Sequence, residues 1–315
     1  MTSIRDALDP ELLEAYDRAE GFALEDLPRL RTLLHAQEAE ALRPDPDVQF
    51  RDLTIPGPAD HPELLVRLFT PARRGDGALP VVVFFHGGGF LFGTRFRHQD
   101  LCCRYAKHVG CAVISVEYRL APEHKAPAQA EDGYAALCWA AEHGGDLGLD
   151  PGRIVVAGVS AGGNLAAAVV LLARDRGGPR IALQMPLSAE LDHTMSTPSA
   201  REITDPKVWS YGYSQVSWRA LLPEGQSVTG YMSPAAAEEL RGLPPLFAYV
   251  GGLDPFRDEN VNYWERLRRA GVFVEARVYP GCFHCFELKA PEAACARDAY
   301  DASYRALRRA FGLGA

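Results

Sequence analysis

The segment Gly158-Val159-Ser160-Ala161-Gly162 contains a candidate nucleophile. It follows a β-branched run at 154–156 and precedes an apolar stretch at 165–173, which predicts a strand that turns directly into a helix. A serine at such a turn is exposed at the carboxyl edge of a sheet, and its neighbours must be small because the two backbones approach closely. Gly158 and Gly162 meet that need. The pattern therefore predicts Ser160 as a nucleophile.

A serine hydroxyl needs a base to take its proton at neutral pH, and a carboxylate usually orients that base. His193 and His284 are the two histidines that follow Ser160 in the chain. His284 comes just after a predicted strand, whereas His193 lies in an irregular interval, so His284 is the better candidate. Asp254 directly follows another predicted strand and is the favoured acid. Asp258 is the alternative, and either aspartate could instead cap the next helix.

A glycine-rich segment, His86-Gly87-Gly88-Gly89, follows the continuous apolar run 81–85. Glycines let backbone N–H groups point at a developing oxyanion without interference from side chains. Such loops also bind phosphates, but no Lys-Ser or Lys-Thr follows this one and the dinucleotide spacing is absent. The segment therefore indicates donors for the negative charge that forms when a serine attacks a carbonyl group.

The composition excludes several classes of protein. The 315 residues are 47% hydrophobic, enough for a sizeable core in one large α/β domain or two ordinary ones. A net charge of -8 without a basic cluster argues against nucleic-acid binding. The amino terminus lacks the apolar core of a secretory signal and no run is long enough to span a membrane, so we expect a soluble cytoplasmic protein.

The cysteines raise one alternative chemistry. Seven is an odd number in a long chain, which favours reduced thiols over a disulfide framework. Cys282 and Cys285 form a C-x-x-C that encloses His284, and a redox or metal role for it stays open. No second C-x-x-C or histidine pair completes such a site. We therefore expect neither a metal nor a cofactor.

Strands and helices alternate along most of the chain, which predicts a mostly parallel sheet with right-handed crossovers. An antiparallel pair at a sheet edge is expected from the first two strands. The predicted strands are 48–55, 63–69, 81–85, 112–118, 154–157, 246–250 and 273–279. The predicted helices are 10–42, 97–109, 128–143, 161–174 and 258–270.

The interval 188–243 does not fit this alternation. It is rich in Ser, Thr and Pro and is too long for a connecting loop in a compact domain. The simplest account is an inserted lid, packed against the amino-terminal helices. We therefore expect an amino-terminal helical cap segment at 1–47, a catalytic core at 48–187 and 244–315, and an inserted cap segment at 188–243.

Five motifs stand in order between Pro80 and Phe286. They are His86-Gly87-Gly88-Gly89-Phe90, Tyr118-Arg119-Leu120-Ala121-Pro122-Glu123-His124, Gly158-Val159-Ser160-Ala161-Gly162-Gly163-Asn164, Asp254-Pro255-Phe256-Arg257-Asp258-Glu259 and His284-Cys285-Phe286. On these motifs the chain resembles the hormone-sensitive-lipase-like branch of the α/β-hydrolases, which includes many bacterial carboxylesterases. It departs from that pattern at Val159, where an acidic or hydroxyl residue is common, at Lys125, where proline is usual, and at Cys285, where glycine is frequent.

The resemblance implies an α/β-hydrolase fold with a helical cap. It implies Ser160 as nucleophile, Asp254 as the residue that orients the base, and His284 as that base. It further implies an oxyanion hole made by the backbone N–H groups of Gly88, Gly89 and Ala161. Members of the family often dimerise through the sheet edge nearest the carboxyl terminus, so a homodimer is possible.

The leading hypothesis is hydrolysis of carboxylic esters of short or medium acyl chain through an acyl-enzyme, with a small-molecule ester as substrate. Aromatic residues are the candidate lining of the substrate pocket: Phe90, Phe92, Trp209, Tyr211, Tyr213 and Trp218. The same triad would serve amide or N-acetyl hydrolysis, or acyl transfer to another alcohol. A hypothesis of another class is a non-catalytic receptor on this fold, as in the plant gibberellin receptors, which lack the histidine that is present here as His284.

Overall fold

A single eight-stranded sheet runs through the computed structural model, which describes residues 4–314 apart from 41–44, 62, 74 and 76. The strand order is β1-β2-β4-β3-β5-β6-β7-β8. The strands are β1 (Val48–Pro56), β2 (Glu63–Pro71), β3 (Leu79–Phe85), β4 (Ala112–Val116), β5 (Leu149–Val159), β6 (Leu183–Leu187), β7 (Leu246–Leu253) and β8 (Val274–Phe283).

Pairing within the sheet is mostly parallel, as the alternation of elements predicts. β1 pairs antiparallel with β2, and β2 antiparallel with β4, which confirms the predicted antiparallel pair at one edge. The remaining neighbours are parallel. The sequence prediction missed β6, because Gln184 and Pro186 interrupt its short apolar run. The Gln184 side chain is buried and donates to the carbonyl oxygen of Pro244 at 2.9 Å.

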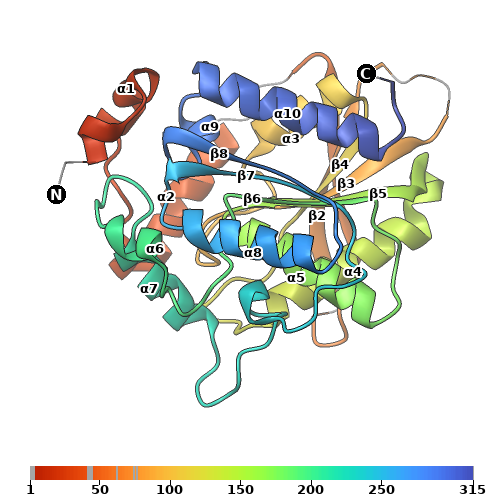
Figure 1. Cartoon of the computed structure of the whole chain (residues 1–315). Helices are drawn as coiled ribbons and strands as arrows, with labels where there is room; N and C mark the ends of the chain where they lie inside the picture. Colours follow the sequence, from red (N-terminus) through yellow and green to blue (C-terminus); the bar gives the residue numbers. More distant parts are fainter. Residues whose placement is uncertain (1–3, 41–44, 62, 74, 76, 315) are drawn as a thin grey trace.

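Helices cover both faces of the sheet (Figure 1). Figure 1 shows α3 and α10 over one face and α4, α5 and α8 over the other, and each set packs in its own hydrophobic cluster. These helices are α3 (Gln99–Val109), α4 (Ala128–His143), α5 (Ala161–Asp175), α8 (Arg257–Arg269) and α10 (Ala294–Ala310), with the short α9 (Phe286–Lys289) before α10. The prediction did not include α10, because the face that it buries is mostly alanine.

Burial explains why the central elements form. All seven residues of β3 are buried, as expected of a parallel strand that is covered on both faces. From Ala161 to Ala173 every residue of α5 is buried, so this helix is apolar all round and lies inside the molecule. The strand β5 and the helix α5 are therefore held rigidly on each side of the residue that joins them.

Shorter helices lie together at one end of the sheet (Figure 1). They come from the amino terminus and from the interval 188–243. The first group is η1 (Ile4–Ala7), η2 (Pro10–Leu12), α1 (Leu13–Asp17), η3 (Leu24–Asp26) and α2 (Leu27–Glu40), and the second is α6 (Pro198–Glu202) and α7 (Tyr211–Leu221). Elsewhere, η5 (Pro234–Ala236) packs against α5, and η4 (Gly144–Leu147) lies between α4 and β5. The division into core and cap segments stays a prediction.

The predicted continuous helix at 10–42 is wrong in its middle, because the chain leaves the helix between Asp17 and Leu24. Gly21 there has φ +80°, and a Cβ atom on it would lie 2.5 Å from the carbonyl oxygen of Pro206. The Tyr213 hydroxyl accepts a bond from the Phe22 N–H at 3.0 Å. The break therefore lets the amino-terminal segment dock on the 188–243 interval. The predicted end of the helix, at residues 41 and 42, lies outside the described residues.

None of the helices in the described ranges is both long and apolar enough to cross a bilayer.

Candidate active site

Ser160 lies at a strained turn between β5 and α5. Its backbone has φ +59° and ψ −120°, a conformation that costs a non-glycine residue about 1–3 kcal/mol. A Cβ atom on Gly158 would collide with the carbonyl oxygen of Gly162, and one on Gly162 with that of Phe85. Both glycines are therefore needed for the strand and the helix to approach closely, which is the reason that the sequence pattern indicated.

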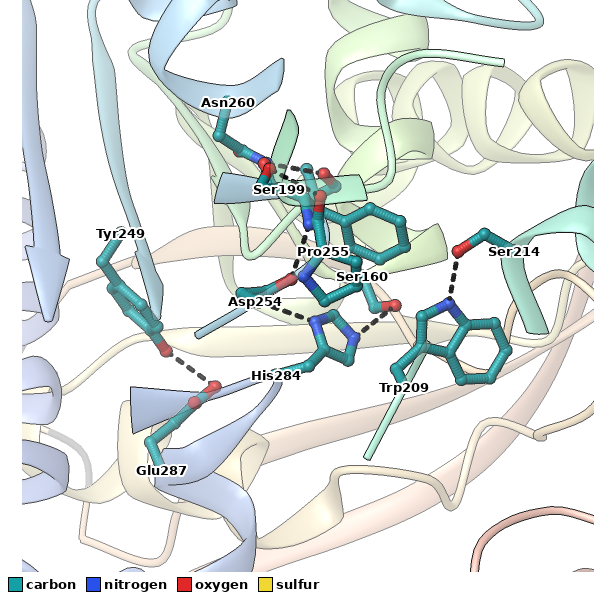
Figure 2. Close-up of polar contacts among 12 residues, drawn as sticks. Ser160, Ser199, Trp209, Ser214, Tyr249, Asp254, Pro255, Asn260, His284 and Glu287 are labelled. Carbon is teal, nitrogen blue, oxygen red and sulfur yellow. Dashed lines mark hydrogen bonds and ion pairs between the residues drawn. The ribbon is translucent and has the colours of Figure 1, made fainter. Parts of the chain in front are cut away.

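The structure brings Ser160, Asp254 and His284 together (Figure 2). The Nε2 atom of His284 lies 2.9 Å from the Oγ atom of Ser160, and its Nδ1 atom lies 2.8 Å from Oδ2 of Asp254. All three side chains are buried. These distances fit a relay in which the serine hydroxyl donates to Nε2 and the Nδ1–H group donates to the carboxylate.

Two effects shift the pKa of the His284 imidazole in opposite directions. Burial disfavours the charged form, but the adjacent Asp254 carboxylate favours it, and the pKa is raised well above its usual value. The carboxylate is itself held in place, because its Oδ1 atom accepts a bond from the Phe256 N–H at 2.9 Å. The Phe256 ring packs edge-on against the imidazole at 5.1 Å between centroids. The ring of His284 is therefore fixed both by a hydrogen bond and by packing.

The alternative acid and base lie elsewhere. The Asp258 carboxylate accepts a bond from the Ser199 N–H at 2.8 Å and pairs with Arg257 at 2.7 Å, so it joins α6 to α8. The Nδ1 atom of His193 lies 3.2 Å from the Oγ atom of Ser233. The geometry at Ser160 thus favours Asp254 and His284 over these two residues.

The loop after β3 presents backbone N–H groups beside Ser160. Within the described part of the chain the N–H groups of Gly88 and Gly89 donate to no protein acceptor. The N–H of Ala161 is at the first position of α5, where a helix leaves its N–H groups without intrahelical partners. The positive end of the α5 dipole also lies there. These three groups are free to donate to a negatively charged oxygen.

His86 supports this loop as a neutral side chain. Burial lowers its pKa to about 3, and its Nδ1–H donates to the carbonyl oxygen of Gly87 at 2.9 Å. The Tyr118 hydroxyl donates to the carbonyl oxygen of His86 at 2.7 Å. The histidine and tyrosine of two separate sequence motifs therefore hold the glycine loop in shape.

The six aromatic residues predicted to line the pocket occupy different environments. The Trp209 ring lies 6.3 Å from that of His284 (Figure 2), and its Nε1–H donates to the Ser214 hydroxyl at 3.1 Å. The side chains of the remaining five divide into a buried group and a partly exposed group. Phe90, Phe92 and Trp218 are buried, whereas Tyr211 and Tyr213 are partly exposed.

An open cavity of about 530 Å³ lies in the group of shorter helices. It is largely apolar and is lined by Phe22, Leu24, Glu25, Thr204, Pro206, Ser210, Gly212, Tyr213 and Val216. The Phe22 ring packs against both Phe92 at 5.4 Å and Trp209 at 5.6 Å between centroids. One aromatic layer, Phe22 and Trp209, therefore stands between this cavity and His284.

Sequence reasoning assigned no role to the buried polar residues around the nucleophile. The Asn164 amide donates to the carbonyl oxygen of Glu190 at 2.8 Å, and the Glu259 carboxylate accepts from the Leu191 N–H at 2.5 Å. Glu287 accepts from the Tyr249 hydroxyl at 3.0 Å, on the far side of His284 in Figure 2. The signal that could have found them is a carboxylate inside an otherwise apolar segment, such as Phe286-Glu287-Leu288.

The cysteines are all free thiols in the structure. In the described ranges, no group of three or more His, Cys, Asp or Glu side chains is arranged to hold a metal ion. The thiols of Cys282 and Cys295 face each other, and Cys285 contacts His284. The two cysteines of the C-x-x-C pattern therefore do not face a common site.

Comparisons with known proteins agree with this geometry. A family model described as alpha/beta hydrolase fold matches residues 82–288. Esterase LipI of Mycobacterium tuberculosis (strain ATCC 25618 / H37Rv) is 39% identical over 85% of this chain and 84% of its own length. Carboxylesterase NlhH of the same strain is 36% identical, over 90% of this chain and 88% of its own.

Among solved structures, one titled Bacterial Heroin Esterase superposes with a TM-score of 0.93 at 38% sequence identity. The superposition covers 98% of this chain and 99% of that one. The motif order, the mostly parallel sheet and these relatives all lead to the same conclusion. The chain belongs to the α/β-hydrolase family, in its hormone-sensitive-lipase-like branch of carboxylesterases.

Proposed function

We propose that this protein hydrolyses carboxylic esters of short or medium acyl chain, with Ser160 as nucleophile, His284 as general base and Asp254 as the residue that orients the base. The observation that carries the proposal is the unbroken relay from hydroxyl to imidazole to carboxylate, with distances of 2.9 and 2.8 Å. The esterase and carboxylesterase names of the relatives support the same reaction.

The reaction would proceed in two halves. The Ser160 oxygen attacks the ester carbonyl carbon while Nε2 of His284 takes the hydroxyl proton. The carbonyl oxygen becomes an oxyanion that accepts hydrogen bonds from the N–H groups of Gly88, Gly89 and Ala161. When the intermediate collapses, the same proton passes to the leaving alcohol. A water molecule, deprotonated by His284, then attacks the acyl-enzyme and releases the acid.

The substrate class is inferred from the surroundings of the relay. The cavity in the group of shorter helices has a largely apolar lining. Trp209 and Phe22 separate it from His284. A small apolar acyl or alcohol group fits this environment, since burial of each CH₂ group contributes about 0.8 kcal/mol. No charged side chain other than Glu25 lines the cavity among the described residues, which is consistent with an uncharged ester.

A panel of p-nitrophenyl esters of increasing chain length tests the proposal, with Ser160→Ala as the control variant. We expect turnover of short and medium esters by the wild type, and a loss of roughly a thousandfold or more in the variant. Matched ester and amide substrates separate esterase from amidase activity. A preference for the amide would contradict the ester assignment.

Labelling with a fluorophosphonate tests the nucleophile without any choice of substrate. An enzyme of this type should be modified covalently at Ser160, with a matching mass increase on the peptide that contains it. A non-catalytic receptor on the same fold would leave Ser160 unmodified, and so would a chain in which the relay does not activate the hydroxyl group.

A further inference from the structure

Glu190 is a buried glutamate in the loop that follows β6. Its side chain is fully buried, and neither carboxyl oxygen has a hydrogen-bond partner among the described residues. A buried polar group without a partner costs free energy, typically several kcal/mol on scales for transfer to an apolar medium. An apolar residue at this position would avoid that cost, so the carboxyl group requires an explanation.

The other two buried glutamates near the relay differ from Glu190. Glu259 accepts bonds from the backbone N–H groups of Leu191 and Asp192, at 2.5 and 3.3 Å. Glu287 accepts a bond from the Tyr249 hydroxyl. Each of these two carboxylates therefore stabilises a neighbouring element of the protein, and Glu190 is distinguished from them by having no such hydrogen bond.

The backbone around Glu190 is held on several sides. Its N–H donates to the carbonyl oxygen of Ser160 at 3.2 Å, and its own carbonyl oxygen accepts the Asn164 amide at 2.8 Å. On either side, the Asn260 amide donates to the carbonyl oxygen of Ala189 at 2.7 Å, and the Leu191 N–H donates to Glu259. The direction of the Glu190 side chain is therefore set by a loop with little freedom to move.

The groups around the Glu190 carboxyl group belong to the same region of the molecule as Ser160. The Ser217 hydroxyl of α7 faces it and donates its single proton to the carbonyl oxygen of Gly89 at 2.9 Å, so it offers the Glu190 carboxyl group an acceptor but no donor. His284 and Asp254 lie close enough for their charges to act on it. Glu190 thus lies near both Ser217, which contacts the glycine loop, and the relay.

The protonation state of Glu190 limits what it can bind. Burial raises the pKa of its carboxyl group to about 8, so the group carries its proton at neutral pH. A neutral carboxyl group has one O–H donor and a carbonyl acceptor. A neutral partner that satisfies both must also donate and accept, as a hydroxyl group does.

We propose that Glu190 is a specificity-determining residue that binds a hydroxyl group carried by the ester substrate, beside the reacting carbonyl. This inference rests on the proposed esterase function and narrows its substrate class to hydroxyl-bearing esters. The missing hydrogen bonds of the free enzyme are then made in the complex. The carboxyl group takes no part in the transfer of the serine proton, which remains with His284.

Two pairs of esters that differ by a hydroxyl group in place of a methyl group test the proposal. Methyl 3-hydroxypropanoate and methyl butanoate place the difference on the acyl side. The pair 2-hydroxyethyl butanoate and propyl butanoate places it on the alcohol side. The measured quantity is the ratio of kcat/KM for the hydroxyl ester to that for its methyl partner, obtained by pH-stat titration at pH 7.

In Glu190→Leu we expect this ratio to fall by about tenfold for one of the two pairs, with the methyl ester hydrolysed at least as well as by the wild type. Glu190→Gln should keep most of the hydroxyl preference, because an amide also donates and accepts. If the leucine variant does not fold, Glu190→Met gives the same comparison with an unbranched side chain of similar length.

Glu287→Gln is the matched control, since Glu287 is also buried and also acts electrostatically on His284 and Asp254. Its ratios should equal those of the wild type. Equal ratios in Glu190→Leu and the wild type would overturn the proposal, and so would an equal loss in Glu287→Gln. A wild type that hydrolyses none of the four esters contradicts the esterase function itself, whereas hydrolysis of all four without any effect of Glu190 contradicts only this inference.

Discussion

Gly89 and Trp209 lie so close that a methyl group on Gly89 would collide with the Cη2 atom of the Trp209 ring. The two residues belong to different parts of the molecule, since Gly89 is in the loop after β3 and Trp209 precedes α7. Ser217 of α7 strengthens the contact by donating to the carbonyl oxygen of Gly89 at 2.9 Å. The loop that would hold the oxyanion is therefore shaped partly by the 188–243 interval.

Gly89→Ala should lower kcat/KM for p-nitrophenyl butyrate by about a hundredfold, because the displaced loop no longer aims its N–H groups at the oxyanion. Gly110→Ala is the control, since Gly110 also has positive φ (+76°) but has open space around it. That variant should keep its activity and lose about 1 kcal/mol of stability. Similar activity in the two variants would show that the contact with Trp209 does not matter.

Activity should fall in acid as His284 becomes protonated, because a charged imidazole cannot accept the Ser160 proton. Burial lowers the pKa of His284, but the interactions with Asp254 and Cys285 together raise it, so the midpoint of the acid limb should lie above the ordinary value of about 6.5. The rate rises with pH through that midpoint. A profile of kcat/KM against pH measures this midpoint, and circular dichroism checks that the protein stays folded over the same pH range. A midpoint below about 6 would refute the expectation.

Asp254→Asn should reduce kcat by about a thousandfold or more, because an amide cannot hold His284 in the tautomer that accepts the serine proton. Asp258→Asn should leave kcat within a few-fold of the wild type. It should instead lower stability by about 1 kcal/mol, since Asp258 accepts the Ser199 N–H at the start of α6. Steady-state kinetics and thermal unfolding of both variants test this, and the opposite pattern would make Asp258 the functional acid.

Gly21→Ala should weaken the docking of the amino-terminal segment by about 1–3 kcal/mol, through its positive φ and a contact of 2.6 Å between the new Cβ atom and the Tyr213 hydroxyl. Hydrogen exchange of residues 4–23 should become faster. Gly145→Ala is the control, because Gly145 has an ordinary φ and nothing within 4 Å of the added Cβ atom. Unchanged exchange in Gly21→Ala would show that the segment is held by other contacts.

The order of strands and helices around the nucleophile followed from local patterns. Continuous apolar runs such as 81–85 predicted buried strands, and the glycines on both sides of Ser160 predicted the tight turn, because close approach of backbones permits few residue types. The same reasoning missed β6, whose run contains Gln184 and Pro186, and α10, whose buried face is mostly alanine. Both elements are buried by tertiary packing, although their residues lack the continuous apolar pattern that predicts a buried element.

The sequence was enough to select Ser160, Asp254 and His284 as candidates, since each follows a predicted strand and the carboxyl ends of parallel strands meet at one edge. Only the folded chain decided that Asp258 joins α6 to α8 instead, that the helix at 10–42 breaks near Gly21, and that Glu190 is buried without a partner. These outcomes depend on contacts between residues far apart in the sequence. Whether a buried carboxyl group has a hydrogen-bond donor depends on the residues that the tertiary structure packs around it. The local sequence does not identify those residues.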